Sequence, residues 1–530
     1  MRFAQGRVFG SVALLALTAW VTTLSAQPAP GPAPGSFSGE PLPSNGLLLD
    51  PNGQPAVMPL PSTNVEASAY GVLPAGETLA AMEAPKTPPG APALADAAKA
   101  PAAPTGDAAK LPEGVTWGDV KKNFSSWLSD SKSNTYPNVT VNAVFQADAG
   151  FFDQDPQSVL AHGDIQDGAD FRRARLAAKA SITETVNAFF QMDFAFPGRP
   201  TFTDVWVEQT QLPVLGNFRV GQWKQPFSLE VVSSFRYTTF MERSLLFQAF
   251  TPFRHLGAGF YDHSDNLNWT WAASGFRTGQ DQFGDSISDN GGWGTAERLT
   301  HLFYYDEPAE GRYYLHGGLG HFFSTPPNHI FNFRTIPELF IGENAPGAVG
   351  TSGQPIPGVI NGTPFFVATG PLNLNNYNVF GTELLWVNGP WSLQAEAMGT
   401  IANRINGSNL FFGGAYAQVG YFLTGEHRPY DRNLGQIDRV KPFTNFFRLG
   451  RGPDLCNGWG AWEVASRVSM IDLNDKDVRG GEMLDLTLGV NWYWNPFTKV
   501  VFNYIHAFNN SPIYGRNDTD MFAMRAQMDF

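Results

Sequence analysis

Cysteine is almost absent from this sequence of 530 residues, since Cys456 is its single example. One cysteine cannot form an internal disulfide, so backbone pairing and packing must stabilise the chain. Long apolar runs are missing as well. No stretch after the first thirty residues approaches the roughly 20 consecutive apolar residues that an α-helix needs to span a bilayer. Together with a mean hydropathy of −0.20, this excludes a bundle of membrane helices.

Basic residues are outnumbered, with 35 Lys and Arg against 48 Asp and Glu and a formal net charge of −13. A chain this acidic lacks the attraction for phosphate backbones that nucleic-acid binding requires, so we expect no nucleic-acid partner. Aromatic residues, in contrast, make up 14% of the chain and hydrophobic residues 43%. These fractions are enough for a large folded body.

The first 135 residues predict three segments that precede the main domain. Arg2 and Arg7 come before the apolar stretch 8–17, and Ala26 provides a small residue at a cleavage site, so residues 1–26 are predicted to be a cleaved signal peptide. A single anchoring helix is the alternative. Residues 27–115, rich in Pro, Ala and Gly, cannot offset their ordering entropy and predict a disordered linker. Residues 116–135 predict a short amphipathic helix, which either contacts the membrane or pore mouth or packs on the next domain.

From residue 136 to residue 530 the hydrophobic pattern has a period of two. In the last ten residues, for example, Phe522, Met524, Met528 and Phe530 alternate with mostly polar residues. The same alternation returns around Leu484–Trp494, Val186–Phe196 and Trp391–Ala397. A period of two predicts strands with one oily face. The oily row runs to the carboxyl terminus, which is typical of a strand that faces lipid.

Short turns alternate with long Gly, Asn and Pro-rich stretches, as in outer-membrane barrels. We therefore predict an all-β fold: a transmembrane antiparallel β-barrel of about 16 strands over residues 136–530, with a water-filled lumen. The last strand must close against the first, because lipid tolerates no unpaired edge. Strict alternation places either 324–371 or 425–457 on the short-turn side, so we expect that one segment is miscounted. A terminal aromatic such as Phe530 resembles the signal by which the barrel-assembly machinery recognises its clients.

The stretch FRRARLAAKASI places three cations on the face opposite its oily residues. Arg173, Arg175 and Lys179 would point into the lumen, where they can guide anions. Alternatively they neutralise acids that point inward by the same logic, namely Asp193, Asp204, Glu208, Glu396, Glu463 and Asp485. The aromatic-rich segment 221–260 lies outside the strand register and contains Arg236, Arg243 and Arg254. It predicts a loop folded into the lumen; a loop capping the rim is the alternative.

These motifs resemble those of the phosphate-selective porin O and P family. The matching stretches are FRRARL, the FRVGQWKQPFSLE to FMERSL run, YFLTGEHRPYD, GAWEVASRVSMIDL, LTLGVNWYWNPFTKVVFNYIHA and RAQMDF, in the same order. The resemblance implies a sixteen-stranded barrel, a homotrimer, an arginine-lined track and an inward third loop. It depends on no single motif. The anion-binding residues it implies, with those of the pattern above, are Arg172, Arg173, Arg175, Lys179, Arg219, Lys224, Arg236, Arg243, Arg254, Arg467 and Arg525.

One departure affects the expected solute. The strict phosphate members place lysines in the inward loop, and residues 228–255 contain none. We predict an outer-membrane porin for passive diffusion of small solutes, above all anions such as phosphate or carboxylates, with outer-membrane lipid as its surroundings. A general diffusion porin without anion preference, or a structural barrel tied to the cell wall through its tail, are the alternatives. No GxSxG motif occurs, and His255, Asp262, His263 and Ser264 are explained as solvated polar residues, so we expect neither an enzyme nor a cofactor or metal site.

Overall fold

The computed structural model describes residues 136–195, 200–278, 292–342, 359–360, 362–449 and 456–530. The predicted signal peptide, linker and amphipathic helix (1–26, 27–115 and 116–135) lie outside the described residues. Within them, no helix has both the length and the apolar composition to cross a membrane.

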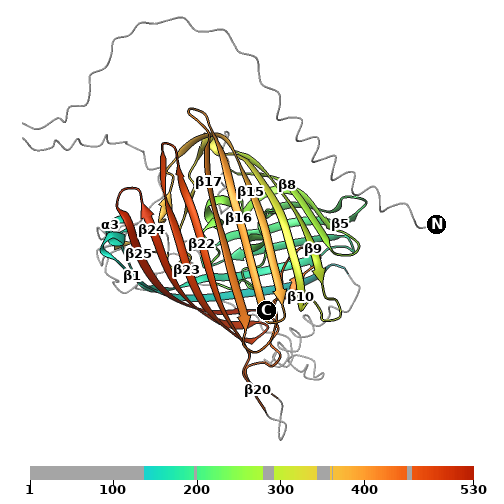
Figure 1. The fold of residues 1–530 in the computed structure, drawn as a ribbon. Coiled ribbons are helices and arrows are strands. Elements are labelled where there is room, and N and C mark those ends of the chain that lie inside the picture. Colours follow the sequence, from blue (N-terminus) through green and yellow to red (C-terminus); the bar gives the residue numbers. More distant parts are fainter. Residues whose placement is uncertain (1–135, 196–199, 279–291, 343–358, 361, 450–455) are drawn as a thin grey trace, which may run out of the picture. The chain divides into compact units, whose positions relative to one another are not determined.

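A single large sheet forms the wall of the barrel (Figure 1). Its first strand, β1, pairs antiparallel with its last, β25, so the sheet closes on itself without an edge. The sheet contains seventeen strands, but one of them, β11, has only two residues and merely extends the edge of β15. The wall is therefore made of sixteen strands, as predicted. These are β1 (Asn138–Gln154), β3 (Gly168–Ser181), β4 (Val186–Asp193), β5 (Thr201–Leu212), β6 (Gly216–Lys224), β7 (Arg254–His263), β8 (Trp269–Arg277), β9 (Trp293–Tyr305), β10 (Tyr313–Thr325), β15 (Leu372–Asn388), β16 (Trp391–Arg404), β17 (Leu410–Phe422), β22 (Ala461–Asp475), β23 (Val478–Asn495), β24 (Thr498–Ser511) and β25 (Gly515–Asp529).

The oily rows predicted from the sequence point away from the lumen. On β25, Phe522, Met524 and Met528 are each about half exposed, while the alternate residues Ala523, Arg525 and Gln527 are buried. Leu484 and Leu488 of β23 are exposed in the same way. The terminal residue is part of the wall, because the Phe530 amide donates to the Ala143 carbonyl at 3.1 Å and the Ala143 amide donates back at 3.0 Å. The closure predicted for the last strand is confirmed.

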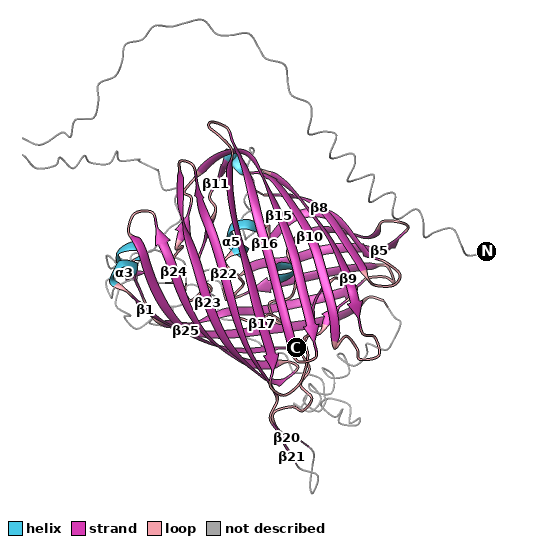
Figure 2. Ribbon diagram, in the orientation of Figure 1, coloured by secondary structure: helices cyan, strands magenta, loops and turns pink. Residues whose placement is uncertain are grey.

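The small elements lie in the connections and are drawn in Figure 2. The helices are α3 (Pro156–His162), α4 (Leu229–Val232), α5 (Leu246–Phe250) and the 3₁₀ turn η2 (Pro327–His329). The short strands are β2 (Asp164–Ile165), β11 (Ile330–Phe331), β12 (Arg334–Thr335), β13 (Val359–Ile360), β14 (Val367–Ala368), β18 (Tyr430–Asp431), β19 (Gln436–Ile437), β20 (Phe447–Leu449) and β21 (Cys456–Gly458). They pair as β2 with β13, β12 with β14, β18 with β19, and β20 with β21.

The sixteen strands alternate in direction without a miscount, so that expectation was wrong. Following the pairings, the connection 326–371 joins β10 to β15 on the long-loop side. The connection 423–460 joins β17 to β22 on the opposite side, which it shares with two-residue turns such as 389–390 and 496–497. A long segment therefore enters on the short-turn side, and it is this segment that made the topology look irregular.

Two connections from the long-loop side pack inside the barrel and form a hydrophobic core there. We call residues 225–253 the inward loop; its Phe227, Leu246 and Phe250 are buried. They belong to one cluster with Phe333 and Leu339 of the connection 326–371 and with inward residues of the wall, including Val501, Ile505 and Met521. The prediction of a loop folded into the lumen is confirmed. Part of the inner face of the wall is apolar, because its side chains pack against these loops.

Candidate permeation pathway

The inward loop is fixed at both ends of its first helical turn, α4. At the start of α4, the Glu396 carboxylate of β16 accepts from the Leu229 amide at 3.1 Å and the Glu230 amide at 2.8 Å. At its end, Lys224 Nζ donates to the carbonyls of Val231, Val232 and Ser233 at 2.8, 2.7 and 2.8 Å. An anion at the amino end and a cation at the carboxyl end of a helix both match its dipole. The wall thus holds α4 by electrostatics as well as by packing.

Arg243 supports the same turn from within the loop. Its Nε donates to the Glu230 carbonyl at 2.9 Å and its Nη2 to the Ser233 carbonyl at 3.3 Å. The Glu230 carboxylate folds back and accepts from the Ser244 amide and hydroxyl, the latter at 2.8 Å. The guanidinium of Arg243 therefore donates to backbone carbonyls of the inward loop and stabilises the shape of that loop.

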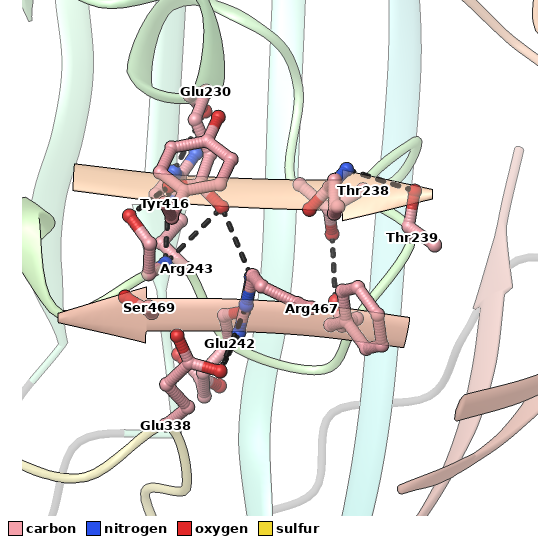
Figure 3. A network of polar contacts seen from close by, with 12 residues as sticks. Glu230, Thr238, Thr239, Glu242, Arg243, Glu338, Tyr416, Arg467 and Ser469 are labelled. Carbon is pink, nitrogen blue, oxygen red and sulfur yellow. Dashed lines mark hydrogen bonds and ion pairs between the residues drawn. The ribbon is translucent and has the colours of Figure 1, made fainter. Parts of the chain in front are cut away.

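Arg467 joins the inward loop to a second inward segment (Figure 3). From β22, Arg467 Nε and Nη2 donate to Glu338 at 2.8 and 2.5 Å, and Nη1 lies 3.2 Å from Glu230. Glu338 also accepts from Thr487 Oγ1 at 2.5 Å, while its own amide donates to Asp485 at 3.0 Å. Burial is the largest influence on Glu338 and raises its pKa above the ordinary value despite the nearby guanidinium. One buried cation of β22 therefore holds together two acids, Glu230 of the inward loop and Glu338 of the connection 326–371.

A second cluster closes around Glu242 of the inward loop. Arg525 of β25 donates to Asp148 at 2.7 and 2.6 Å and to Glu242 at 2.7 Å. Arg172 adds a forked pair to Glu242 at 2.9 and 3.1 Å. Burial alone would raise the pKa of Glu242, but the charges of Arg172, Arg525 and Arg173 together hold it well below its usual range. This carboxylate is ionised throughout the physiological range.

A β-bulge explains how two consecutive arginines both reach inward. The pairing of β1 with β3 slips between Gln146 and Ala147, which leaves Arg172 as an extra residue between Phe171 and Arg173. Arg173 then donates to Gln146 at 2.7 Å while Arg172 reaches Glu242. Strict alternation would have sent one of the two guanidiniums into lipid. A bulge is a common device for re-aiming a side chain on a barrel wall.

Most of the predicted anion-binding residues already have a carboxylate partner. Seven of the eleven lie within 4.0 Å of one: Arg172, Arg175, Arg219, Arg236, Arg254, Arg467 and Arg525. The wall pairs include Arg175 with Asp193 at 2.7 Å and Arg254 with Asp204 at 2.7 Å. The remaining four are Arg173, Lys179, Lys224 and Arg243, for which the described part of the chain supplies no such carboxylate. All six acids predicted to point inward make contacts inside the barrel.

A cavity of about 170 Å³ lies between one side of the wall and the inward segments. Strands β5 to β9, the end of α4, and residues Asn433, Leu434 and Gln436 of the connection 423–460 line it. Its charged lining groups are Arg219, Lys224 and Arg298 against Asp204 and Asp262. The aromatic Trp223 and Tyr261 complete a mixed surface that can contact both ionic and uncharged parts of a solute. Arg219 and Lys224 are among the residues that the sequence predicted to line the pore and bind anions.

Two ion pairs of the lumen were missed by the sequence reasoning. Arg298 of β9 forms a forked pair with Glu383 of β15 at 2.8 and 2.7 Å. Arg428 of the connection 423–460 pairs with Glu463 of β22. The two wall acids, Glu383 and Glu463, lie at inward positions of alternating strands. The period of two could therefore have predicted that both point into the barrel. No periodicity marks Arg428, since it enters the barrel from a connection.

At the long-loop rim, α3 packs against the connection 326–371 through the imidazole ring of His162. His162 stacks on Phe366 with ring centroids 3.9 Å apart, and burial lowers the pKa of His162 to about 4. An undocked imidazole has a pKa near 6.5, so the undocked state binds more protons between these values and docking must weaken as the pH falls from about 6.5 toward about 4. We expect faster hydrogen exchange at the Gly163 amide, which donates to Val159, in acid than at neutral pH after correction for intrinsic rates. His162→Phe, which keeps a stacked ring, should remove this pH dependence; the same acid response in that variant would contradict the assignment.

Comparison with known proteins gives matches along the whole described barrel. The model of the family described as phosphate-selective porin O and P matches residues 139–530. Porin O of Pseudomonas aeruginosa is 25% identical over 400 residues, which cover 70% of this chain and 84% of that protein. An uncharacterised protein of Caulobacter vibrioides is 26% identical over 431 residues, which cover 79% of this chain and 76% of that one.

Solved structures of similar fold are more distant in sequence. An anion-selective porin from Comamonas acidovorans superimposes with a TM-score of 0.44 at 11% identity, covering 74% of this chain and 100% of that chain. The trimer form of OmpT from Vibrio cholerae has a TM-score of 0.44 at 9% identity, covering 75% of this chain and 100% of that one.

Proposed function

Because the chain belongs to the phosphate-selective porin O and P family and is an outer-membrane channel, we propose that it conducts small solutes by passive diffusion with a weak preference for anions. The observation that carries the proposal is the charge of the cavity lining, where Arg219, Lys224 and Arg298 outnumber Asp204 and Asp262. Charges that line a narrow aqueous path select among ions more strongly than the net charge of the whole protein does. An excess of one cation favours small anions, including phosphate and carboxylates.

Both arginines of the cavity lining are already paired with carboxylates, which supports a weak preference for anions rather than a strict one. Arg219 and Arg298 each have a carboxylate partner at 2.6 to 2.8 Å, and Lys224 Nζ donates to three carbonyls. A phosphate ion entering the cavity would have to compete with these partners for donors. The same pairs favour a second candidate, a general diffusion channel without ion preference, which differs in predicting a reversal potential near zero under a salt gradient.

The experiment is the reversal potential of purified channels in planar bilayers under a salt gradient, with chloride, phosphate and malate compared. Arg219→Gln leaves Glu208 unpaired and should move the reversal potential toward cation preference, while Glu208→Gln should move it toward stronger anion preference. The double variant removes one charge of each sign. It should return close to the unmodified channel, which separates a charge effect from a shape effect. An unmodified channel that prefers cations would overturn the proposal.

We extend the proposal to assembly and export. Phe530 has an exposed ring at the end of a fully paired strand, an arrangement that supports its use by the barrel-assembly machinery. The homotrimer and the signal peptide at residues 1–26 are part of the same proposal, as is the absence of a catalytic role. Cross-linking in native membranes would test the trimer, and the mass of the mature amino terminus would test cleavage after Ala26.

A further inference from the structure

Part of the lining of the cavity between the wall and the inward segments is apolar. Trp223 of β6, with Pro226 and Val232 of the inward loop, contributes to this part, and Leu434 contributes from the connection 423–460. Leu434 is 42% exposed, so much of its side chain is open to contact with a solute. Burying such apolar surface against an apolar part of a solute is favourable, roughly in proportion to the area removed from water. An inorganic ion gains nothing from this surface.

The wall carries only small side chains where the cavity meets β7 and β8. Gly259, Ala272 and Ser274 line the cavity there, and the strand register places Gly259 beside Ser274. None of the three has a side chain larger than a hydroxymethyl group, so the strand pair offers a smooth surface to a planar ring. The cavity volume of about 170 Å³ is also suitable, since a protein cavity of roughly 150 Å³ holds one benzene molecule. The space therefore fits one six-membered ring with a small substituent.

The arginines of the lining are suited to a singly charged solute. Arg219 donates through Nε and Nη2 to Glu208 at 2.9 and 2.6 Å, and Arg298 donates through the same two nitrogens to Glu383 at 2.8 and 2.7 Å. The Nη1 group of each guanidinium lies outside these bonds. Because each ion pair has no net charge, its field on a solute is weak and does not offset the cost of dehydrating a phosphate dianion. A carboxylate costs less to dehydrate and can accept from the Nη1 groups.

We infer that the cavity binds an organic monoanion with one apolar ring beside its carboxylate, such as benzoate, in preference to inorganic phosphate. The inference rests on the proposed channel function and names the substrate class of its cavity. The carboxylate accepts from Arg219 or Arg298, while the ring packs on Leu434 and on the small side chains of β7 and β8. The ring contact supplies the affinity that the paired arginines do not, so affinity depends on the apolar part of the solute more than on its charge.

The test compares anions at a single channel. The potassium chloride current through the full-length protein in planar bilayers is titrated with benzoate, acetate and phosphate, and the concentration that halves the current is measured for each. We expect benzoate to act at a concentration about tenfold below that of acetate, and below that of phosphate, because only benzoate buries a ring. Leu434→Asn keeps the size of the side chain but removes its apolar surface, so it should raise the benzoate concentration about threefold and leave acetate unchanged. Ala272→Leu occupies the space of the ring and should remove the difference between benzoate and acetate.

Matched controls come from the same chain. Leu215, in the turn between β5 and β6, is 46% exposed and lies outside the cavity lining, so Leu215→Asn repeats the chemical change away from the solute. Ala258 of β7 pairs with the exposed Val220 on the outward face, so Ala258→Leu adds the same bulk toward lipid. Both controls should keep the tenfold difference.

Three results would overturn the inference: benzoate and acetate acting at equal concentrations, phosphate acting at a lower concentration than benzoate, or Leu434→Asn responding like Leu215→Asn. Benzoate and acetate carry the same charge, so their ratio measures the ring contact alone. The reversal potential, which measures the anion preference, can fail independently of that ratio. The two proposals are therefore refuted by different measurements.

Discussion

Replacing Arg467 by methionine is expected to destabilise the folded barrel by about 3 to 5 kcal/mol, the usual result of removing one partner from a buried ionic cluster. Arg467 is 1% exposed and is the cation that Glu230 and Glu338 share. Without it, these two acids and Asp485 are left in a buried site with no guanidinium between them. The measurement is the midpoint of urea unfolding of the purified protein in detergent, followed by the loss of strand signal in circular dichroism.

The pH dependence of that defect gives a second readout. With the guanidinium gone, the folded-state pKa of Glu338, already raised, must rise further, so the folded variant binds more protons than the unfolded chain between the two pKa values. Stability then falls as the pH rises through this window and recovers in acid. Arg404→Met is the control, since Arg404 pairs with the largely exposed Asp477 at the rim and such pairs contribute little. Equal midpoints for the two variants, or a defect that grows in acid, would contradict the role given to Arg467.

Strand periodicity was a reliable guide to the wall because lipid imposes the same rule on every strand. The outward rows of β23 and β25 were legible in the sequence, and so was the closure of the last strand. The inner face obeys no such rule. Val501, Ile505 and Met521 point inward and are apolar, because their neighbours are the packed loops rather than water. The positions of the inward loop and of the connection 326–371, which periodicity does not encode, determine which part of the inner wall is dry.

The arginines of the lumen show the same limit of what strand periodicity can predict about the solute path. Arg173 and Arg175 both lie over the ring of Phe235 of the inward loop, but strand periodicity carries no information on which acid lies across the strand pair. Arg175 faces Asp193 through the β3–β4 register, and Arg172 reaches Glu242 through a bulge that no local pattern announces. Strand periodicity could not show that the connection 423–460 enters the barrel, because this depends on contacts between residues that are distant in sequence, such as Gly435 and Thr270.

Lys224 and Lys179 were both predicted to contact anions, and the structure separates them. Lys224 Nζ donates to three carbonyls at the end of α4, whereas Lys179 is exposed at the short-turn end of β3. Lys224→Met removes charge-assisted hydrogen bonds from carbonyls that remain buried, with an expected cost of about 2 kcal/mol, felt mainly by the inward loop. Lys179→Met removes an exposed charge of the same kind and should leave stability unchanged.

The two lysine variants are distinguished by hydrogen exchange, because each removes a cation from the solute path and both should shift the reversal potential toward cations. Lys224→Met should increase hydrogen exchange at the loop amides of Val232 and Ser233, which bond within α4, and should add noise to the open channel. Lys179→Met should leave both unchanged while shifting the reversal potential slightly toward cations, because a charge at the mouth acts on ions through water. If Lys224→Met altered only the reversal potential and left loop exchange as it was, its ammonium would be a solute contact after all. The hydrogen bonds from Lys224 of β6 to the end of α4 would then contribute nothing to the shape of the solute path.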